Sequence, residues 1–541
     1  MAKKKSSRTD NSGGSRPGDP AQDEATPAKS AQERAEEQLK RHDQMLLNMM
    51  RSIVTEPLLG NVRDALENNQ PDSRFDIIIS LNEFYKDGIP AALEEVKKRA
   101  AQWGVKSAAS SHYVFACLTA KQIMNLAEEA RTLIREQGQR ATVVYRIWED
   151  NDVSVSLTRS LSTVKVDAAQ RSFQARGEGI VWAVLDSGIQ GDHPHFKYAD
   201  STFGPINALS IESPVSHLDY TPLNNGPLKD EFGHGTHVAG IIAGFWKSAD
   251  PKGQRVVGVE TRDESNNEAI PQRESLTTIC GVAPACRLVS MKVIADTTDS
   301  TAKQTAGQGK VSWVLLAIDQ IQQWNQYGKR LLVHGVNMSL GYDFDPRWFA
   351  CGQSPLCVEV NRLVKSGVSV VVSAGNAGYS AMLTSAQKAV ARYSDISITD
   401  PGNAALAITV GSTHREMPHT YGVSYFSSRG PTGDGRMKPD LVAPGERIIS
   451  CAAGLEQKKY PPGKDGDGAD LPVLYCEQTG TSMAAPHVSG AIAAFLSVRR
   501  EFIGQPEQVK QLFLDNAIDL GREPKFQGAG LLDLMKVLQA V

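Results

Sequence analysis

The sequence has little cysteine, no zinc-binding spacing, no marked basic excess and no long apolar run. None of its seven cysteines is spaced as C-x-x-C, so a structural zinc site is not indicated. Because no apolar run approaches the length of a bilayer-spanning helix, we expect no membrane segment. A formal net charge of −3 does not provide the basic surface that favours binding to a phosphate backbone, so nucleic acid is not an expected partner. What remains is an ordinary soluble composition, with 41% hydrophobic and 22% charged residues.

The first eight residues are basic, as in a signal peptide, but no apolar core follows them. We therefore expect a cytoplasmic protein. In a reducing compartment cysteines remain free thiols, and their odd number fits this expectation, although six form sequence-local pairs that could be drawn as disulfides.

Two N-terminal segments come before any compact unit. Residues 1–33 are rich in Ser, Gly, Pro and charge, which predicts a disordered tail. Residues 34–74 carry apolar side chains at helical spacing, interrupted by Pro57 and Gly60. This helical segment is expected to dock onto the next domain, and the alternative is a surface that recruits a partner protein.

Residues 75–157 alternate strand and helix on the scale of one small α+β domain. Apolar strands are expected at 75–81, 113–118 and 143–148, with helices at 89–103 and 120–136. Such an alternation predicts a small sheet with helices on one face.

From residue 158 to 541, strands rich in Val, Ile and Leu alternate with helices. That composition is typical of strands buried on both faces of a parallel sheet. We therefore predict a doubly wound α/β domain whose active site lies at the carboxyl ends of its strands. The expected strands are 180–185, 288–294, 331–338, 368–373, 405–410 and 440–450, and the expected helices are 236–246, 312–326, 358–366 and 482–498. A polar insertion is expected at 246–279, with a small extra strand at 255–259.

Ser482 lies between small residues at the start of the expected helix 482–498. A serine there can simply cap the helix. The helix N-terminus also offers free N–H groups and positive potential, which suit a nucleophile and the oxyanion that its attack creates. Two upstream residues supply the partners that such a nucleophile needs, because Asp186 ends an apolar strand and His234 begins a small-residue helix. Together they fit the roles of acid, base and nucleophile.

Five blocks in this order resemble the subtilisin-like serine proteases, from about residue 165 to the C-terminus. The order Asp…His…Ser is the subtilisin order and differs from that of chymotrypsin or the α/β-hydrolases. The blocks are Asp186-Ser187-Gly188, His234-Gly235-Thr236-His237, Asn337-Met338-Ser339-Leu340-Gly341, Ala374-Gly375-Asn376 and Gly480-Thr481-Ser482-Met483-Ala484.

The resemblance implies a serine endopeptidase with Asp186, His234 and Ser482 as its triad. It implies that Asn376 and the backbone N–H of Ser482 bind the oxyanion, and that His237 is structural. An extended substrate would add as a strand between two enzyme segments. By resemblance these consist of Ser339, Leu340 and Gly341 on one side and Gly307, Gln308 and Gly309 on the other.

Residues 75–157 resemble the inhibitory propeptide of subtilisins, which has a ferredoxin-like fold. The resemblance implies a zymogen in which the unit's last segment lies in the groove and Leu157 fills the first pocket. Autoprocessing would then separate Leu157 from Thr158, and the alternative is that this segment is only a linker. Family members often bind calcium, but no loop here matches such a site, so no cofactor is expected and calcium stays open.

Two other functions are consistent with the sequence. Some subtilisin-like enzymes pass the acyl group to an amine, and the insertion 246–279 could shield the site from water for such a transpeptidase. A non-catalytic peptide-binding module is the other alternative.

Overall fold

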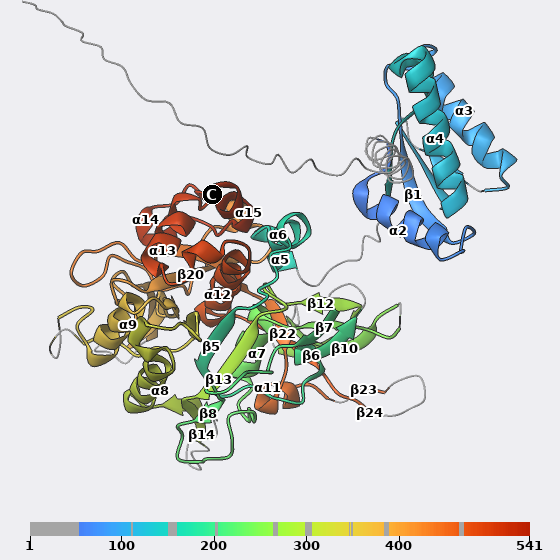
Figure 1. Ribbon diagram of the computed structural model, residues 1–541. Helices are drawn as coiled ribbons and strands as arrows, with labels where there is room; N and C mark the ends of the chain where they lie inside the picture. Colours follow the sequence, from blue (N-terminus) through green and yellow to red (C-terminus); the bar gives the residue numbers. More distant parts are fainter. Residues whose placement is uncertain are drawn as a thin grey trace, which may run out of the picture. The chain divides into compact units, whose positions relative to one another are not determined.

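The computed structural model describes most of the chain (Figure 1). The described residues are 53–105, 107–109, 112–149, 159–200, 204–250, 252–262, 269–297, 306–345, 347, 350–383, 389–461, 463–464 and 470–541. The chain divides into two compact units, residues 1–153 and 154–541. The predicted tail 1–33 and the predicted processing site at Leu157 and Thr158 lie outside the described residues.

The N-terminal unit is a four-stranded antiparallel sheet with helices packed on it. The strand order is β2-β3-β1-β4, which is the order of a ferredoxin-like fold. The strands are β1 (Arg74–Leu81), β2 (Ser107–Ala109), β3 (Tyr113–Thr119) and β4 (Val144–Glu149), and the helices are α2 (Glu56–Glu67), α3 (Gly88–Gln102) and α4 (Ala120–Gln137). The predicted strands and helices of residues 75–157 are therefore all present, and β2 is an additional short strand.

The helix α2 belongs to this same unit. Its Leu58, Leu59 and Val62 are at most 1% exposed and lie in one core with the sheet and the other helices. The predicted boundary at residue 74 therefore does not separate two cores. Pro57 falls in the first turn of α2, where its missing N–H costs no helical bond, and the helix continues through Gly60.

The C-terminal unit is built on a seven-stranded parallel sheet of order β21-β20-β17-β16-β5-β13-β8. The strands are β5 (Val181–Asp186), β8 (Leu218–Asp219), β13 (Arg287–Lys292), β16 (Gly335–Met338), β17 (Ser369–Ser373), β20 (Ile408–His414) and β21 (Leu441–Glu446). Nearly every residue of these strands, apart from the short edge strand β8, is buried, which is why they read as continuous apolar runs in the sequence. The predicted doubly wound α/β fold is confirmed.

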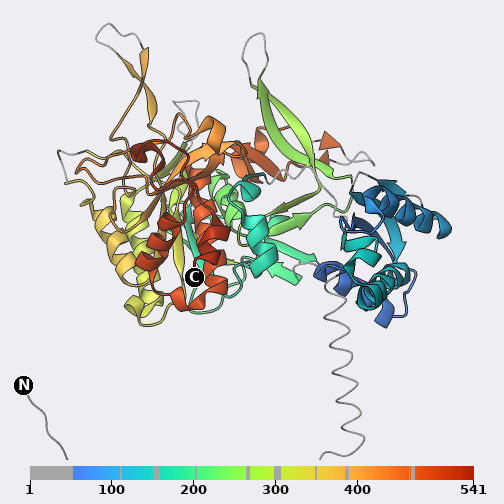
Figure 2. The same cartoon turned by 90° about the horizontal axis from the view of Figure 1, so that it is seen from above.

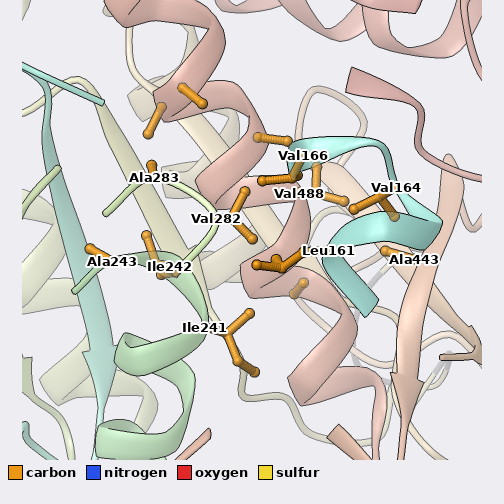
Figure 3. Packing of buried hydrophobic residues seen from close by; sticks show 14 of the residues in the cluster. Leu161, Val164, Val166, Ile241, Ile242, Ala243, Val282, Ala283, Ala443 and Val488 are labelled. Atoms are coloured by element: carbon orange, nitrogen blue, oxygen red, sulfur yellow. The ribbon is translucent and has the colours of Figure 1, made fainter. Parts of the chain in front are cut away.

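The helix α12 (Thr481–Val498) passes through the centre of this unit. Figure 3 shows its Val488 among Leu161, Val164 and Val166 on one side and Val282 on another. Gly490 allows this close passage, because a Cβ there would lie 2.5 Å from Val282. No apolar run of membrane length was expected, yet α12 is long and apolar enough to span a bilayer. Of its 18 residues, 83% are buried inside the unit, as in the core helix of a globular domain.

The other helices around the sheet that were predicted are α7 (His234–Ile242), α8 (Val311–Trp324) and α9 (Pro355–Lys365). The helix α7 ends earlier than predicted, and the chain enters β9 (Phe245–Lys247). The predicted strand 440–450 is wrong as a single element. It breaks at Arg447, where φ is +54°, into β21 and β22 (Ile448–Cys451), which belong to different sheets.

Insertions extend the unit on one side. The predicted polar insertion contains a hairpin of β10 (Gln254–Arg262) and β11 (Ala269–Leu276), so the extra strand expected at 255–259 is present but longer. A second hairpin joins β18 (Tyr379–Leu383) to β19 (Ala389–Tyr393). Figure 2 shows both hairpins projecting in the same direction from the unit. Among these insertions, β10 also pairs in parallel with β25 (Tyr475–Gln478), the strand just before α12.

Candidate active site

Asp186 and His234 meet at the carboxyl end of β5, an inner strand of the parallel sheet. The Nδ1 of His234 lies 2.7 Å from Oδ1 of Asp186, which is 1% exposed. His234 is the first residue of α7 and keeps about 20% of its side chain exposed. Gly233, which precedes it, has φ +95°, and a Cβ there would lie 2.3 Å from the carbonyl oxygen of Ala453. Only glycine therefore allows this tight entry into the helix.

A second carboxylate, Asp230, supports this pair from inside the protein. It is 1% exposed and accepts hydrogen bonds from the backbone N–H groups of Gly233 and Thr236 and from the hydroxyl of Thr236, at 2.6–2.8 Å. The Ser187 hydroxyl donates to Asp230 at 2.9 Å, and the Ser187 N–H donates to Asp186 Oδ1 at 2.8 Å. Asp230 thus fixes both the start of α7 and the turn after β5. Burial raises the pKa of Asp230, against the opposing effect of these hydrogen bonds.

The electrostatic surroundings of His234 are negative. Burial acts to lower its pKa, but the charge and hydrogen bond of Asp186, with the charges of Asp230 and Glu456, raise the pKa above its ordinary value. These groups favour the imidazolium, the form that a general base takes when it accepts a proton.

Ser482 is the second residue of α12, and its backbone N–H faces out of the helix N-terminus without an acceptor inside the helix. Its hydroxyl donates to the carbonyl oxygen of Ser339 at 3.2 Å, and the Ser339 hydroxyl donates to the carbonyl of Ser482 at 2.8 Å. The end of β16 is thereby fixed against the start of α12. A hydrogen-bond chain from Ser339 through Asn337 to Ser489 further along α12 completes the connection, at 2.9–3.0 Å.

Asn376 follows β17 and is held by one neighbour of Ser482. Its Oδ1 accepts from the backbone N–H of Thr481 at 2.9 Å and from the Thr481 hydroxyl at 3.0 Å. The hydroxyl of Thr481 in turn accepts from the N–H of Gly375 at 3.2 Å. With its oxygen anchored in this way, Asn376 keeps Nδ2 as a donor without a protein acceptor among the described residues.

Most of the predicted substrate residues line one cavity of about 330 Å³. Ser339, Leu340 and Gly341 form part of it, and Gly307 and Gly309 lie in it together with His234. Gln308 belongs to the same strand, β15 (Ala306–Gly309), but does not line the cavity. The segment before α8 is in part a hairpin, because β15 pairs with β14 (Ile294–Thr297).

His237 points away from this cavity. It is completely buried, and its Nε2 lies 3.1 Å from the carbonyl oxygens of both Ile448 and Cys476. Burial lowers its pKa to about 3, so it stays neutral at physiological pH. This placement is that of a structural histidine.

Neither a metal cluster nor a disulfide bridge occurs within the described ranges. Those residues contain no group of three His, Cys, Asp or Glu arranged to hold a metal ion. All seven cysteines are described, and each is a free thiol.

Sequence reasoning missed Asp230 and Thr481 as supporting residues. Asp230 could have been found, because an aspartate shortly before a helix start is an N-cap signal. No local signal identifies Thr481, because its bond to Asn376 joins positions that lie 105 residues apart.

The family model and the related proteins that match this chain point to the same protein family. A model described as the subtilase family matches residues 177–530. The intracellular serine protease of Paenibacillus polymyxa is 28% identical over 400 residues, which cover 73% of this chain and 90% of that protein. Subtilisin E of Bacillus subtilis (strain 168) is 28% identical over 426 residues, covering 77% and 82%. The major intracellular serine protease of the same bacterium is 30% identical over 334 residues, covering 60% and 71%.

The matched family region holds all of the residues assembled above, from the end of β5 to the start of α12. Because this region covers more than half of the sequence, the chain belongs to the subtilase family and is a subtilisin-like serine endopeptidase.

Proposed function

We propose that the chain hydrolyses internal peptide bonds with Ser482 as nucleophile, His234 as general base and Asp186 as the group that orients and stabilises the imidazolium. The observation that carries this proposal is the 2.7 Å contact between Asp186 Oδ1 and His234 Nδ1. It leaves Nε2 as the ring nitrogen that can accept a proton. Ser482 gives up its bond to the Ser339 carbonyl, donates its proton to His234 and attacks the substrate carbonyl carbon. His234 then passes that proton to the leaving amine, and water hydrolyses the acyl-enzyme by the reverse proton movements.

Asn376 and the backbone N–H of Ser482 stabilise the oxyanion in this proposal. Thr481 holds the amide oxygen, so that Nδ2 is directed toward solvent or substrate before the reaction begins. A donor that is already oriented costs no reorganisation when charge develops on the substrate oxygen.

The substrate lies extended between the Ser339–Gly341 segment and the strand that holds Gly307, Gln308 and Gly309. Support comes from the cavity that these segments share with His234. The absence of side chains at Gly307 and Gly309 allows a peptide backbone to come close. We propose no cofactor for this chemistry, and calcium remains a question for a metal titration.

The N-terminal unit acts as an intramolecular inhibitor. Its helices cover one face of the sheet, whereas aromatic side chains that include Tyr145 and Trp148 are 40–66% exposed. Such a patch is unusual on a free domain and suits docking onto another surface. The alignment to subtilisin E is also longer than the matched family region. Restraint of this kind fits a cytoplasmic location, which the names of two intracellular relatives favour.

Autoprocessing at the bond between Leu157 and Thr158 is the corresponding step of activation. We expect the wild-type protein to be cleaved within a few residues of Leu157 and the Ser482→Ala protein to stay in one piece. Intact mass measurements of both proteins check this. A wild-type protein that remains a single chain yet is fully active on peptides would contradict the inhibitor role.

Product masses test the function itself. Incubation with a peptide and an added amine should give only the two hydrolysis fragments, and neither should form with Ser482→Ala. A product joined to the added amine would instead identify a transpeptidase. Tight binding of the peptide without any Ser482-dependent product would identify a non-catalytic binding module.

A further inference from the structure

A second hollow begins immediately before the catalytic serine. It has a volume of about 800 Å³ and shares no lining residue with the cavity at His234. Its lining includes Gln478 and Thr479, which lead directly into α12 and Ser482. Because this lining begins three residues before Ser482, a polypeptide that occupies the first cavity and extends past Ser482 can reach the hollow.

Two segments of the chain form the walls. One wall is the β10–β11 hairpin, which contributes Glu260 and Thr261. The other is α11 (Gly454–Lys458), which contributes Glu456. The two walls are in contact, because a Cβ on Gly258 of β10 would lie 2.5 Å from the Tyr460 ring that follows α11.

The wall formed by α11 is tied to the catalytic histidine. The N–H of Leu455 donates to the carbonyl of Glu231 at 2.8 Å, three residues before His234. A Cβ on Gly233 would lie 3.1 Å from the Cβ of Glu456. The hollow is thus fixed relative to both His234 and Ser482.

The charges of the hollow leave one carboxylate unbalanced. Glu456 pairs with Lys459 at 2.7 Å, and Glu477 pairs with Arg447. The side-chain carboxylate of Glu260 forms no ion pair or hydrogen bond within the described residues, and Glu260 is exposed to solvent. Tyr425, which is 61% exposed, lines the same hollow and offers an aromatic face. A hollow that is lined by both a free carboxylate and an aromatic ring is a favourable environment for a Lys or Arg side chain.

We propose that this Glu260 hollow binds a lysine or arginine side chain in the part of a polypeptide substrate that lies on the carboxyl side of the cleaved bond. The inference rests on the proposed peptidase function and adds a substrate preference to it. The hollow lies between the β10–β11 hairpin and α11, which are not part of the seven-stranded sheet. We therefore expect it to affect which polypeptides are cleaved and not the chemistry of cleavage.

The test uses peptides that differ only in one residue after the cleaved bond, which is Lys, Gln or Glu at each of the first three positions in turn. We expect kcat/KM at low salt to be about two- to fivefold higher for Lys than for Gln at one of these positions, the range for an exposed ion pair. The Glu260→Gln protein should lose this difference, and Glu260→Lys should favour Glu instead. The matched control Glu507→Gln, an exposed carboxylate on α13 (Pro506–Asp515), should keep the wild-type preference.

An unchanged preference for Lys in the Glu260→Gln protein, or no preference in the wild type at any position, would overturn the proposal. Binding of fluorescent Lys and Gln peptides to the Ser482→Ala protein separates this failure from failure of the proposed function. Glu260-dependent tighter binding of the Lys peptide without cleavage by the wild type would retain the hollow and reject the peptidase role. Cleavage that depends on Ser482 but not on Glu260 would support the peptidase role and reject the proposed binding at the Glu260 hollow.

Discussion

From the hydrogen bonds between Thr481 and Asn376 we derive a quantitative prediction about oxyanion stabilisation. Asn376 Oδ1 is held by two donors of Thr481, the backbone N–H at 2.9 Å and the hydroxyl at 3.0 Å. Thr481→Val nearly preserves the side-chain volume but removes the hydroxyl, which donates to Asn376 and accepts from the Gly375 N–H. We expect Asn376 to keep one anchor but to lose part of its fixed orientation.

The size of the effect follows from the value of one hydrogen bond. A net contribution of about 1 kcal/mol corresponds to roughly a fivefold fall in kcat for Thr481→Val. Asn376→Ala removes the donor itself, and here we adopt, rather than derive, the loss of about 10²–10³-fold reported for the oxyanion-hole asparagine of subtilisin. Both changes should leave KM nearly constant, because the donor acts on charge that is present only around the transition state.

A double-mutant cycle tests whether Thr481 acts through Asn376. If it does, the double variant should have the kcat of Asn376→Ala to within about twofold, because no oriented amide remains to lose. Thr413→Val is the control, since that buried hydroxyl donates to the Gly422 carbonyl outside the site and should alter stability without altering kcat. Losses in kcat that simply multiply in the double variant, or an effect of Thr481→Val on KM alone, would refute the reasoning.

Two further predictions concern pH. Glu456→Gln removes a negative charge beside His234, so the pKa of His234 should fall. The acidic limb of the pH profile of kcat/KM should therefore move to lower pH. An unchanged acidic limb would show that Glu456 does not influence His234. Burial lowers the pKa of both His195 and His237 to about 3. Between that pH and about 6.5, the unfolded chain therefore binds more protons than the folded protein does. Stability is consequently lost as the pH falls below 6.5. Between pH 7 and pH 5, each of these histidines should reduce the free energy of unfolding by about 2 kcal/mol. Urea unfolding of the inactive Ser482→Ala protein measures this change. His237→Gln should remove about half of the combined dependence of these two residues, and an identical pH dependence in this variant would contradict its assignment.

The proposed catalytic residues could be selected from the sequence because each lies in a short block with a local cause. Asp186 ends an apolar strand, and His234 and Ser482 begin small-residue helices, so their positions follow from neighbouring residues. The same holds for the parallel sheet, whose buried strands are continuous in the sequence.

What could not be predicted depends on partners far away in the chain. The break at Arg447 separates two strands that are both apolar, and only their pairing with different sheets reveals it. The Glu260 hollow joins β10, α11 and β25, and no local pattern places these three elements together. The sequence suggested that the helical segment before residue 75 docks onto the next domain, but the partners of α2 in β4 and α4 lie far along the chain and could not be read from it.

In the proposed mechanism, Ser482 is a nucleophile that His234 activates. The most direct measurement is covalent labelling with a fluorophosphonate, followed by peptide mapping by mass spectrometry. We predict that one label per chain is found on Ser482 in the wild type, and that labelling is lost in Ser482→Ala and strongly slowed in His234→Ala although both proteins remain folded. Labelling at another residue, or labelling of Ser482 at the same rate without His234, would contradict this mechanism.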